Sequence, residues 1–202
     1  MRAVIFDLGG VLVDYDHTAT IAAVAQISGG GIDDIKRNFE RNGIDFGTGR
    51  LNGDSFYQLL NQEVGIEGGF QRFAEQLCIT QTRVDQAIEY TLSLTWREGV
   101  QVGIISNINE IHADWVYRHL PELAQCQPVI MSNEVGLLKP DPAIYRLALS
   151  RLKLPPADTV FVDDHEANVR GAVEVGMAGI IHREWGDTRL RIERFLAGGS
   201  AD

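Results

Sequence analysis

A short apolar run near the N-terminus sets the tightest limit on what this chain can fold into. Residues 3–6 read Ala-Val-Ile-Phe, and Asp7, Leu8, Gly9 and Gly10 follow directly. A continuous run of this kind is typical of a strand buried on both faces, as in parallel sheets that helices cover on each side. A glycine pair after such a strand predicts a sharp turn of the backbone.

From about residue 83 onward, apolar strands and helical patterns alternate. This alternation predicts parallel strands with helices on both faces. We therefore expect an α/β fold, a doubly wound, Rossmann-like parallel sheet. Further strands are predicted at 100–106, 128–131, 159–163 and 178–182, and helices at 84–98, 111–119, 141–152, 166–175 and 188–196.

Residues 16–80 follow a different pattern. Apolar residues recur there at helical spacing between Gly-rich breaks, without a strand pattern. This predicts a bundle of about four helices, inserted after the first strand as a small α-helical cap. We divide the chain into a core domain of residues 1–15 and 81–202 and a cap domain of residues 16–80.

Composition limits the class of partner. The 202 residues are 45% hydrophobic and 23% charged, as in ordinary globular proteins. The net charge of -10 argues against a nucleic-acid partner, because an acidic surface repels phosphate backbones. We predict no signal peptide, no membrane partner, a cytoplasmic location and structural thiols at Cys78 and Cys126. The oligomeric state is left open.

Polar residues stand at the ends of the predicted strands, where apolar packing does not explain them. They are Asp7 after the first strand, Ser106 and Asn107 after the second, Lys139 beyond the third, and Asp163 and Asp164 after the fourth. Ligands of open parallel sheets bind at the carboxyl ends of the strands. We therefore expect these side chains to converge on one crevice, although each alone is explained as a turn, a helix cap or a solvated loop residue.

The residue types in this set indicate phosphoryl transfer. Three carboxylates in one place repel one another and need a cation, and all-oxygen ligands favour Mg²⁺ where a phosphate shares the site. A hydroxyl, an amide and an ammonium group are the donors that phosphoryl oxygens require. An aspartate in such a site is able to attack phosphorus and form an acyl-phosphate.

Four segments resemble the motifs of the haloacid dehalogenase superfamily, and together they span nearly the whole chain. They are residues 6–12 (FDLGGVL), 105–107 (ISN), 139–145 (KPDPAIY) and 161–168 (FVDDHEAN). The helical insertion resembles the small mobile cap of that family. The resemblance implies a Mg²⁺-dependent phosphatase that hydrolyses a small phosphorylated metabolite through an aspartyl-phosphate intermediate.

The resemblance also implies a role for each site residue. Asp7 would be the nucleophile and a metal ligand, and Lys139 would pair with the phosphate and with Asp7. Ser106 and Asn107 would hold phosphoryl oxygens. Asp164 would bind Mg²⁺ directly with the help of Asp163, and the main-chain carbonyl of Gly9 would supply another metal ligand.

Gly9 departs from the pattern of most phosphatases in this family. They carry a second Asp at that position, which protonates the leaving oxygen and later activates water. The bacterial sugar-phosphate phosphatases that act on glucose-1-phosphate have a similar Asp-Leu-Gly opening followed by Val-Asp-x-Asp, here residues 13–16. Asp14, Asp16 and His17 are candidates for the missing acid/base by proximity in sequence alone, and solvated hinge residues are the ordinary alternative.

Two other functions remain open at this point. A metal-independent 2-haloacid dehalogenase also lacks the second Asp, but it would gain nothing from the adjoining Asp163 and Asp164. A regulatory module that binds phosphate without turning it over would also explain Gly9. Elsewhere, Trp96 and Trp115 lie at helical core spacing and are predicted to pack against the core.

Overall fold

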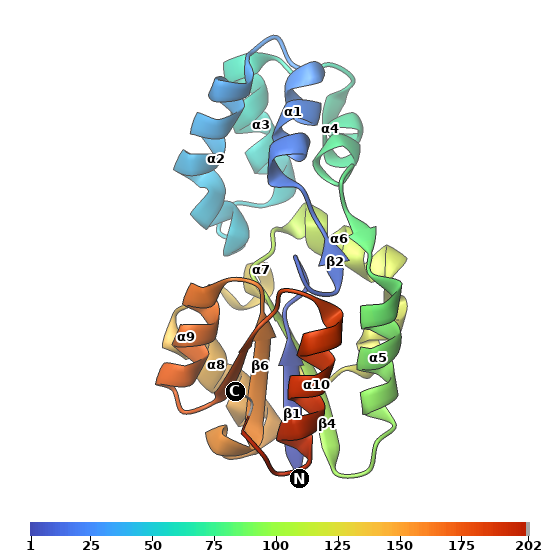
Figure 1. Ribbon diagram of the computed structural model, residues 1–202. Coiled ribbons are helices and arrows are strands. Elements are labelled where there is room, and N and C mark those ends of the chain that lie inside the picture. Colours follow the sequence, from blue (N-terminus) through green and yellow to red (C-terminus); the bar gives the residue numbers. More distant parts are fainter. Residues whose placement is uncertain (201–202) are drawn as a thin grey trace.

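The computed structural model describes residues 1–200, so the last two residues of the predicted core domain lie outside it. A sheet with helices on both faces forms one end of the molecule, and a group of four helices lies beyond the ends of β1 and β6 (Figure 1). The sheet has five strands in the order β5-β4-β1-β6-β7, and every neighbouring pair is parallel. The strands are β1 Arg2–Phe6, β4 Val100–Ser106, β5 Val129–Met131, β6 Thr159–Asp163 and β7 Ala178–Ile181.

The central strand β1 buries both of its faces, as its apolar run predicts. Val4 and Phe6 belong to one hydrophobic cluster, and Ala3 and Ile5 belong to another on the opposite face. Helices α5 Asp85–Thr95, α6 Glu110–His119 and α10 Trp185–Leu196 contribute to the first cluster, and α8 Pro142–Leu152 and α9 Glu166–Glu174 to the second. The predicted α/β fold with a doubly wound parallel sheet is confirmed.

Small differences from the predicted elements have local causes. Helix α10 begins three residues before the predicted start, because the side chain of Glu184 caps it by accepting from the amide of Asp187. The sequence pattern also missed three short elements of one turn or little more, which carry no periodicity. These are η1 Pro121–Gln125, α7 Ser132–Val135 and η2 Pro156–Asp158.

The inserted segment forms its own helical group with its own apolar interior. The helices are α1 His17–Gln26, α2 Ile32–Gly47, α3 Gly53–Val64 and α4 Gly69–Leu77, and all fall within residues 16–80. Phe46 and Phe56 stack at the centre of this group, with ring centroids 4.2 Å apart. The limits of the two domains stay a prediction.

A two-stranded ribbon joins the core to the cap. Strand β2, Val13–Asp14, pairs antiparallel with β3, Thr82–Arg83, so the chain enters and leaves the cap side by side. Sequence analysis did not find this ribbon, because strands of two residues have no alternation to detect.

One packing prediction is wrong. Trp96 is 82% exposed, because it lies at the C-terminal end of α5 beyond the buried face of that helix. Trp115 does pack against the core cluster, and Cys78 and Cys126 are free thiols. Among residues 1–200, no helix combines the length and apolar character needed to cross a bilayer.

Candidate active site

Asp7 lies at the carboxyl end of the central strand. Its amide donates to the carbonyl of Val162 on β6 (2.9 Å), which continues the strand pairing to this residue. Its Oδ1 accepts from the amide of Leu8 (2.7 Å), and the residue is 6% exposed. The backbone therefore fixes one oxygen of a buried carboxylate at the middle of the sheet edge.

Lys139 is buried and connects the ends of three strands. Its Nζ lies 2.7 Å from Asp7 Oδ1, 2.7 Å from Asp163 Oδ2 and 3.1 Å from the carbonyl oxygen of Ile105. An ammonium group has three protons, and these three acceptors use them all. The side chain is only 1% exposed, so this is not the solvated loop lysine that its position before Pro140 would ordinarily indicate.

Burial and charge act in opposite directions on the two carboxylates that Lys139 joins. Burial raises the pKa of Asp7 above its usual value, Lys139 opposes this shift, and the charge of Asp163 adds to it. Burial also acts to raise the pKa of Asp163, but Lys139, together with the amide of His165 and the side chain of Asn168, outweighs burial and holds this pKa below its usual value. The site therefore keeps Asp163 ionised, and it makes the negative charge on Asp7 costly even beside Lys139 unless a second cation is present.

Both carboxylate oxygens of Asp163 accept hydrogen bonds from protein donors. Asn168 Nδ2 donates to both of them at 3.1 Å, and the amide of His165 donates to Oδ1 at 2.8 Å. With Lys139 on Oδ2 as well, this carboxylate is placed to orient the lysine. Sequence analysis gave no role to Asn168, which stands five residues after Asp163 in the first turn of α9.

Asp164 has a different environment. Its Oδ1 is buried and has no hydrogen-bond partner within the described residues. Gly10 lies against this carboxylate with φ of 72°, and a Cβ there would stand 2.6 Å from the carboxylate carbon. The second glycine of the motif therefore provides both the left-handed turn and the space that Asp164 needs.

The acidic cluster fits a hard divalent cation. Asp7, Asp163 and Asp164 offer carboxylate oxygens that lie within 4.8 Å of one another. Oxygen-only donors suit Mg²⁺, and the unpaired Oδ1 of Asp164 is the atom that most needs a positive partner. Because Asp163 is held by protein donors, Asp7 and Asp164 are the better-placed pair.

Ser106 and Asn107 follow β4 but differ in their engagement. Ser106 is 3% exposed and, with Gly9, lines a cavity of about 90 Å³. The side chain of Asn107 donates to the carbonyl of Lys139 (2.9 Å) and accepts from its amide (2.7 Å). The side-chain amide of Asn107 thus fixes the loop that carries Lys139, and its contact with phosphoryl oxygens stays a prediction.

A larger cavity of about 260 Å³ lies beside the small one, between cap and core; we call it the chamber. Tyr15, Asn107, Ile108 and His112 line both cavities. The remaining chamber residues come from α2, the start of α1 and two core loops: His17, Phe39, Gly43, Phe46, Gly47, Asn109 and Leu138. Sequence analysis assigned no role to Tyr15 or His112, since nothing local marks residues that meet from distant parts of the chain.

The three candidates for the missing acid/base are separated in the structure. Asp16 caps α1 by accepting from the amide of Ala19 (2.9 Å), and Asp14 is exposed in β2. Only His17 lines the chamber, with its Nδ1 3.2 Å from the hydroxyl of Tyr15.

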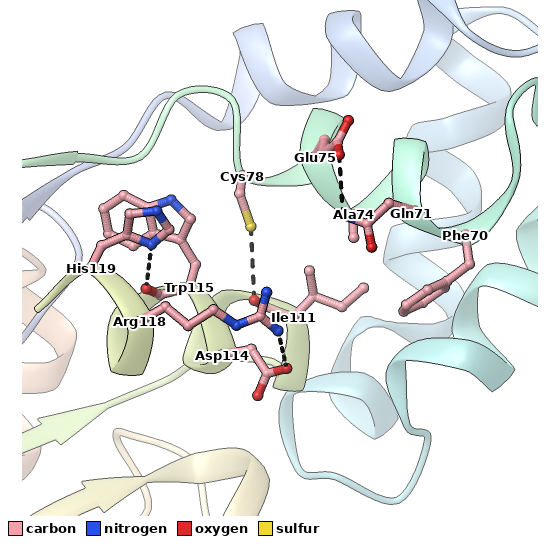
Figure 2. A pocket seen from close by; sticks show the side chains of 10 residues that line it. All are labelled: Phe70, Gln71, Ala74, Glu75, Cys78, Ile111, Asp114, Trp115, Arg118 and His119. Carbon is pink, nitrogen blue, oxygen red and sulfur yellow. Dashed lines mark hydrogen bonds and ion pairs between the residues drawn. The ribbon is translucent and has the colours of Figure 1, made fainter. Parts of the chain in front are cut away.

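Another cavity between cap and core lies on a different part of α6 and contains none of the predicted site residues. Its walls come from α4 and α6, and it includes Phe70, Cys78 and Trp115. Figure 2 shows the thiol of Cys78 directed at the carbonyl oxygen of Ile111, 3.8 Å away. The only cationic side chain on its wall, Arg118, is paired with Asp114 (3.1 Å). We therefore locate the candidate active site at the strand ends and the chamber.

Comparison with known proteins gives a consistent result. The family model for haloacid dehalogenase-like hydrolases matches residues 1–176. D-ribitol-5-phosphate phosphatase of Bacteroides thetaiotaomicron is 26% identical over 187 residues, which cover 87% of this chain and 89% of that protein. A sesquiterpene phosphatase of Aspergillus oryzae is 27% identical, with coverage of 89% and 88%.

Solved structures show the same fold. A HAD family enzyme of Bacteroides thetaiotaomicron, crystallised with magnesium and inorganic phosphate, superposes with a TM-score of 0.81 at 23% identity and covers 92% of this chain and 97% of that one. A HAD-like hydrolase of Porphyromonas gingivalis gives a TM-score of 0.82 at 26% identity, with coverage of 96% and 98%.

Proposed function

The chain belongs to the haloacid dehalogenase-like hydrolase family, and we propose that it is a Mg²⁺-dependent phosphatase acting on a small phosphorylated metabolite. The observation that carries this proposal is the pairing of Lys139 with Asp7 and Asp163 beside the unpaired oxygen of Asp164. Two relatives named as phosphatases of small molecules support the same reaction class.

The geometry suits attack by Asp7. Leu8 and Lys139 both bond to Oδ1, which leaves Oδ2 as the oxygen that attacks phosphorus. A bond from Oδ2 to phosphorus forms as the bond from phosphorus to the alcohol oxygen breaks, and the leaving alkoxide takes a proton from solvent water. Water then attacks the phosphorus of the aspartyl-phosphate, which releases inorganic phosphate and restores the carboxylate of Asp7.

The neighbouring groups divide the work of charge stabilisation. Lys139 neutralises charge on Asp7 and on the phosphoryl group, and Ser106 faces the cavity in which phosphoryl oxygens would lie. Mg²⁺ held by Asp7, Asp164 and the carbonyl of Gly9 would supply further positive charge for the phosphoryl oxygens. Asp163 and Asn168 act through Lys139 as positioning residues.

Phosphate release from a panel of phosphorylated metabolites, with and without EDTA, tests this proposal. We expect release that stops with EDTA and returns with excess Mg²⁺, and Asp7→Asn should lower kcat by more than about 10⁴-fold. Substantial activity in Asp7→Asn would rule out covalent catalysis by this residue.

Two alternatives make different predictions in the same experiment. A metal-independent 2-haloacid dehalogenase would release halide from 2-haloacids in the presence of EDTA, a result that would overturn the proposal. A regulatory module would bind phosphorylated metabolites without releasing phosphate from any of them. The unpaired oxygen of Asp164 disfavours the dehalogenase, because a metal-free site has no use for it.

The finer parts of the function are inferences of the same kind. The relatives support two different substrate classes: the ribitol phosphatase supports a sugar phosphate, and the sesquiterpene phosphatase supports the phosphate ester of an apolar alcohol. The net charge of -10 supports the inference that nucleic acid is not a partner. Two free thiols, Cys78 and Cys126, support a reducing compartment such as the cytoplasm.

A further inference from the structure

We infer that the chamber binds the alcohol part of the substrate and that this alcohol is uncharged and largely apolar, with an aromatic or branched hydrocarbon body. The inference rests on the proposed phosphatase function and narrows its substrate class. The chamber is placed for this role because it shares Tyr15, Asn107, Ile108 and His112 with the small cavity that holds Gly9 and Ser106.

Charge is the first property of the chamber that selects a substrate. Among the described residues that line it, no Lys, Arg, Asp or Glu is present. Burial lowers the pKa of His112 to about 4, so this imidazole is neutral at pH 7. Apart from the imidazole of His17, no side chain that lines the chamber would therefore offer an opposite charge to a carboxylate, an amine or a second phosphate, which would lose hydration there.

Hydrogen-bonding capacity is the second property. The side-chain amide of Asn107 is hydrogen-bonded to the main chain of Lys139. Asn109 and His112 bond to each other through both the ring and the main chain, and His112 Nε2 bonds to the carbonyl of Leu77 (3.0 Å). Most polar groups of the chamber are therefore already satisfied, and a polyol would find few partners for its hydroxyls.

The walls offer apolar surface instead. Phe39 and Phe46 come from α2, and Ile108 and Leu138 come from the core loops on the opposite side. The ring of Phe39 meets His17 edge-on, with centroids 6.4 Å apart. Burial of hydrocarbon against these side chains is the main source of binding free energy that the chamber has to offer.

Gly43 provides a further observation, which concerns the volume of the chamber. It lies in the interior of α2, where glycine is less favourable than alanine because its backbone loses more conformational freedom on folding. A Cβ at Gly43 would meet nothing within 4 Å, so no neighbouring atom requires the glycine. Because Gly43 lines the chamber, the space that it leaves open is space for the substrate.

Hydrolysis of matched alkyl phosphates tests the inference. Benzyl phosphate and geranyl phosphate represent uncharged apolar alcohols, ribitol 5-phosphate a polyol, and phosphoserine a charged alcohol. All are alkyl esters, so they differ mainly in the surface that the chamber would contact. We expect kcat/KM for the two apolar esters to exceed that of the other two by at least about tenfold. Equal values, or the reverse order, would overturn the inference.

Filling the chamber gives a second test, with acetyl phosphate as the small reference substrate. Gly43→Leu should lower the ratio of kcat/KM for geranyl phosphate to that for acetyl phosphate by at least about tenfold. Gly43→Ala should lower the ratio less and raise the melting temperature, which provides a folded variant in the same series. Gln58→Leu adds a similar side chain to α3, outside the chamber, and should leave the ratio unchanged.

The outcomes separate this inference from the function on which it rests. An unchanged ratio in Gly43→Leu would show that the chamber does not hold the alcohol, and it would overturn the inference alone. Release of phosphate from acetyl phosphate with a preference for ribitol 5-phosphate would do the same. Failure to release phosphate from all of these esters and from acetyl phosphate would overturn the proposed function and the inference together.

Discussion

The strand-end cluster and the chamber lie side by side but are built from opposite materials. At the strand ends, one ammonium group bridges two buried carboxylates at 2.7 Å, and a third carboxylate has a buried unpaired oxygen. The chamber wall has aromatic, aliphatic and glycine positions and polar groups that are mostly bonded to each other. The comparison teaches that charge is concentrated where a phosphoryl group and a cation would bind, whereas the chamber beside it, which core and cap residues line together, is largely uncharged.

Removal of Lys139 should cause the largest loss of stability and activity in the strand-end cluster. Lys139→Met leaves Asp7 and Asp163 buried without their shared cation, at a cost of about 3–5 kcal/mol in the free energy of unfolding. Activity should fall by at least about 10³-fold, because the same group neutralises the phosphoryl charge. Urea unfolding and phosphate release measure the two effects. Lys36→Met, an exposed change in α2, is the control, and equal losses in both variants would contradict the role assigned to Lys139.

A carboxylate introduced at residue 9 tests whether the strand-end cluster lacks a group that protonates the alcohol in the chamber. A Cβ at Gly9 would meet nothing within 4 Å, so the first atom of an introduced side chain has space there. If protonation of the alcohol limits turnover, kcat for alkyl phosphates should rise by about 100-fold, whereas acetyl phosphate, with its better leaving group, should gain little. Gly9→Asn is the control without an acidic proton. Similar gains in both variants would show that general acid catalysis is not what was missing.

Asp164→Asn should weaken the response to the cation. The change keeps the shape of the side chain but removes the charge beside Gly10, so the Mg²⁺ concentration for half-maximal activity should rise by at least about tenfold. Asp14→Asn removes an exposed carboxylate from strand β2 of the two-stranded ribbon and should leave the Mg²⁺ response unchanged. If the two variants shift the Mg²⁺ requirement equally, Asp164 is not a ligand.

The last expected effect lies in the chamber and concerns the pH dependence of stability. The pKa of His112 is about 4 in the folded protein, against 6.5 for an ordinary histidine, so folding favours the neutral ring. The stability that His112 contributes is complete above pH 6.5 and is lost as the pH falls toward 4, by about 3 kcal/mol in total. Urea unfolding between pH 7.5 and 4 should show this loss of stability. In His112→Gln, the loss over the same pH range should be smaller by about 3 kcal/mol. Parallel curves for the two proteins would contradict it.

How far sequence analysis reached depends on whether the signal was local. The strand that ends in Asp7 and the alternation after residue 83 are local patterns, and the parallel sheet followed from them. The burial of Lys139 could not be predicted from the sequence, because it depends on Asp163 and Ile105 from two other strands. The chamber was equally hidden, since Tyr15 and Phe39 reach it from segments that no periodicity connects.

Single residues show the same limit. Trp96 has helical core spacing but stands past the point where α5 leaves the core, so its ring is exposed. Asn107 lies in the expected motif, but its side chain turns to the main chain of Lys139. Motifs identify which residues meet, whereas the partner of each polar atom depends on three-dimensional contacts.

Trapping of the covalent intermediate tests the central claim most directly. The enzyme is mixed with substrate and Mg²⁺, quenched in acid during turnover, digested and examined by mass spectrometry. We predict a phosphoryl group on the peptide that contains Asp7, and its absence when Mg²⁺ is withheld. Turnover that continues without phosphoryl on Asp7, or with phosphoryl on another residue, would contradict the account.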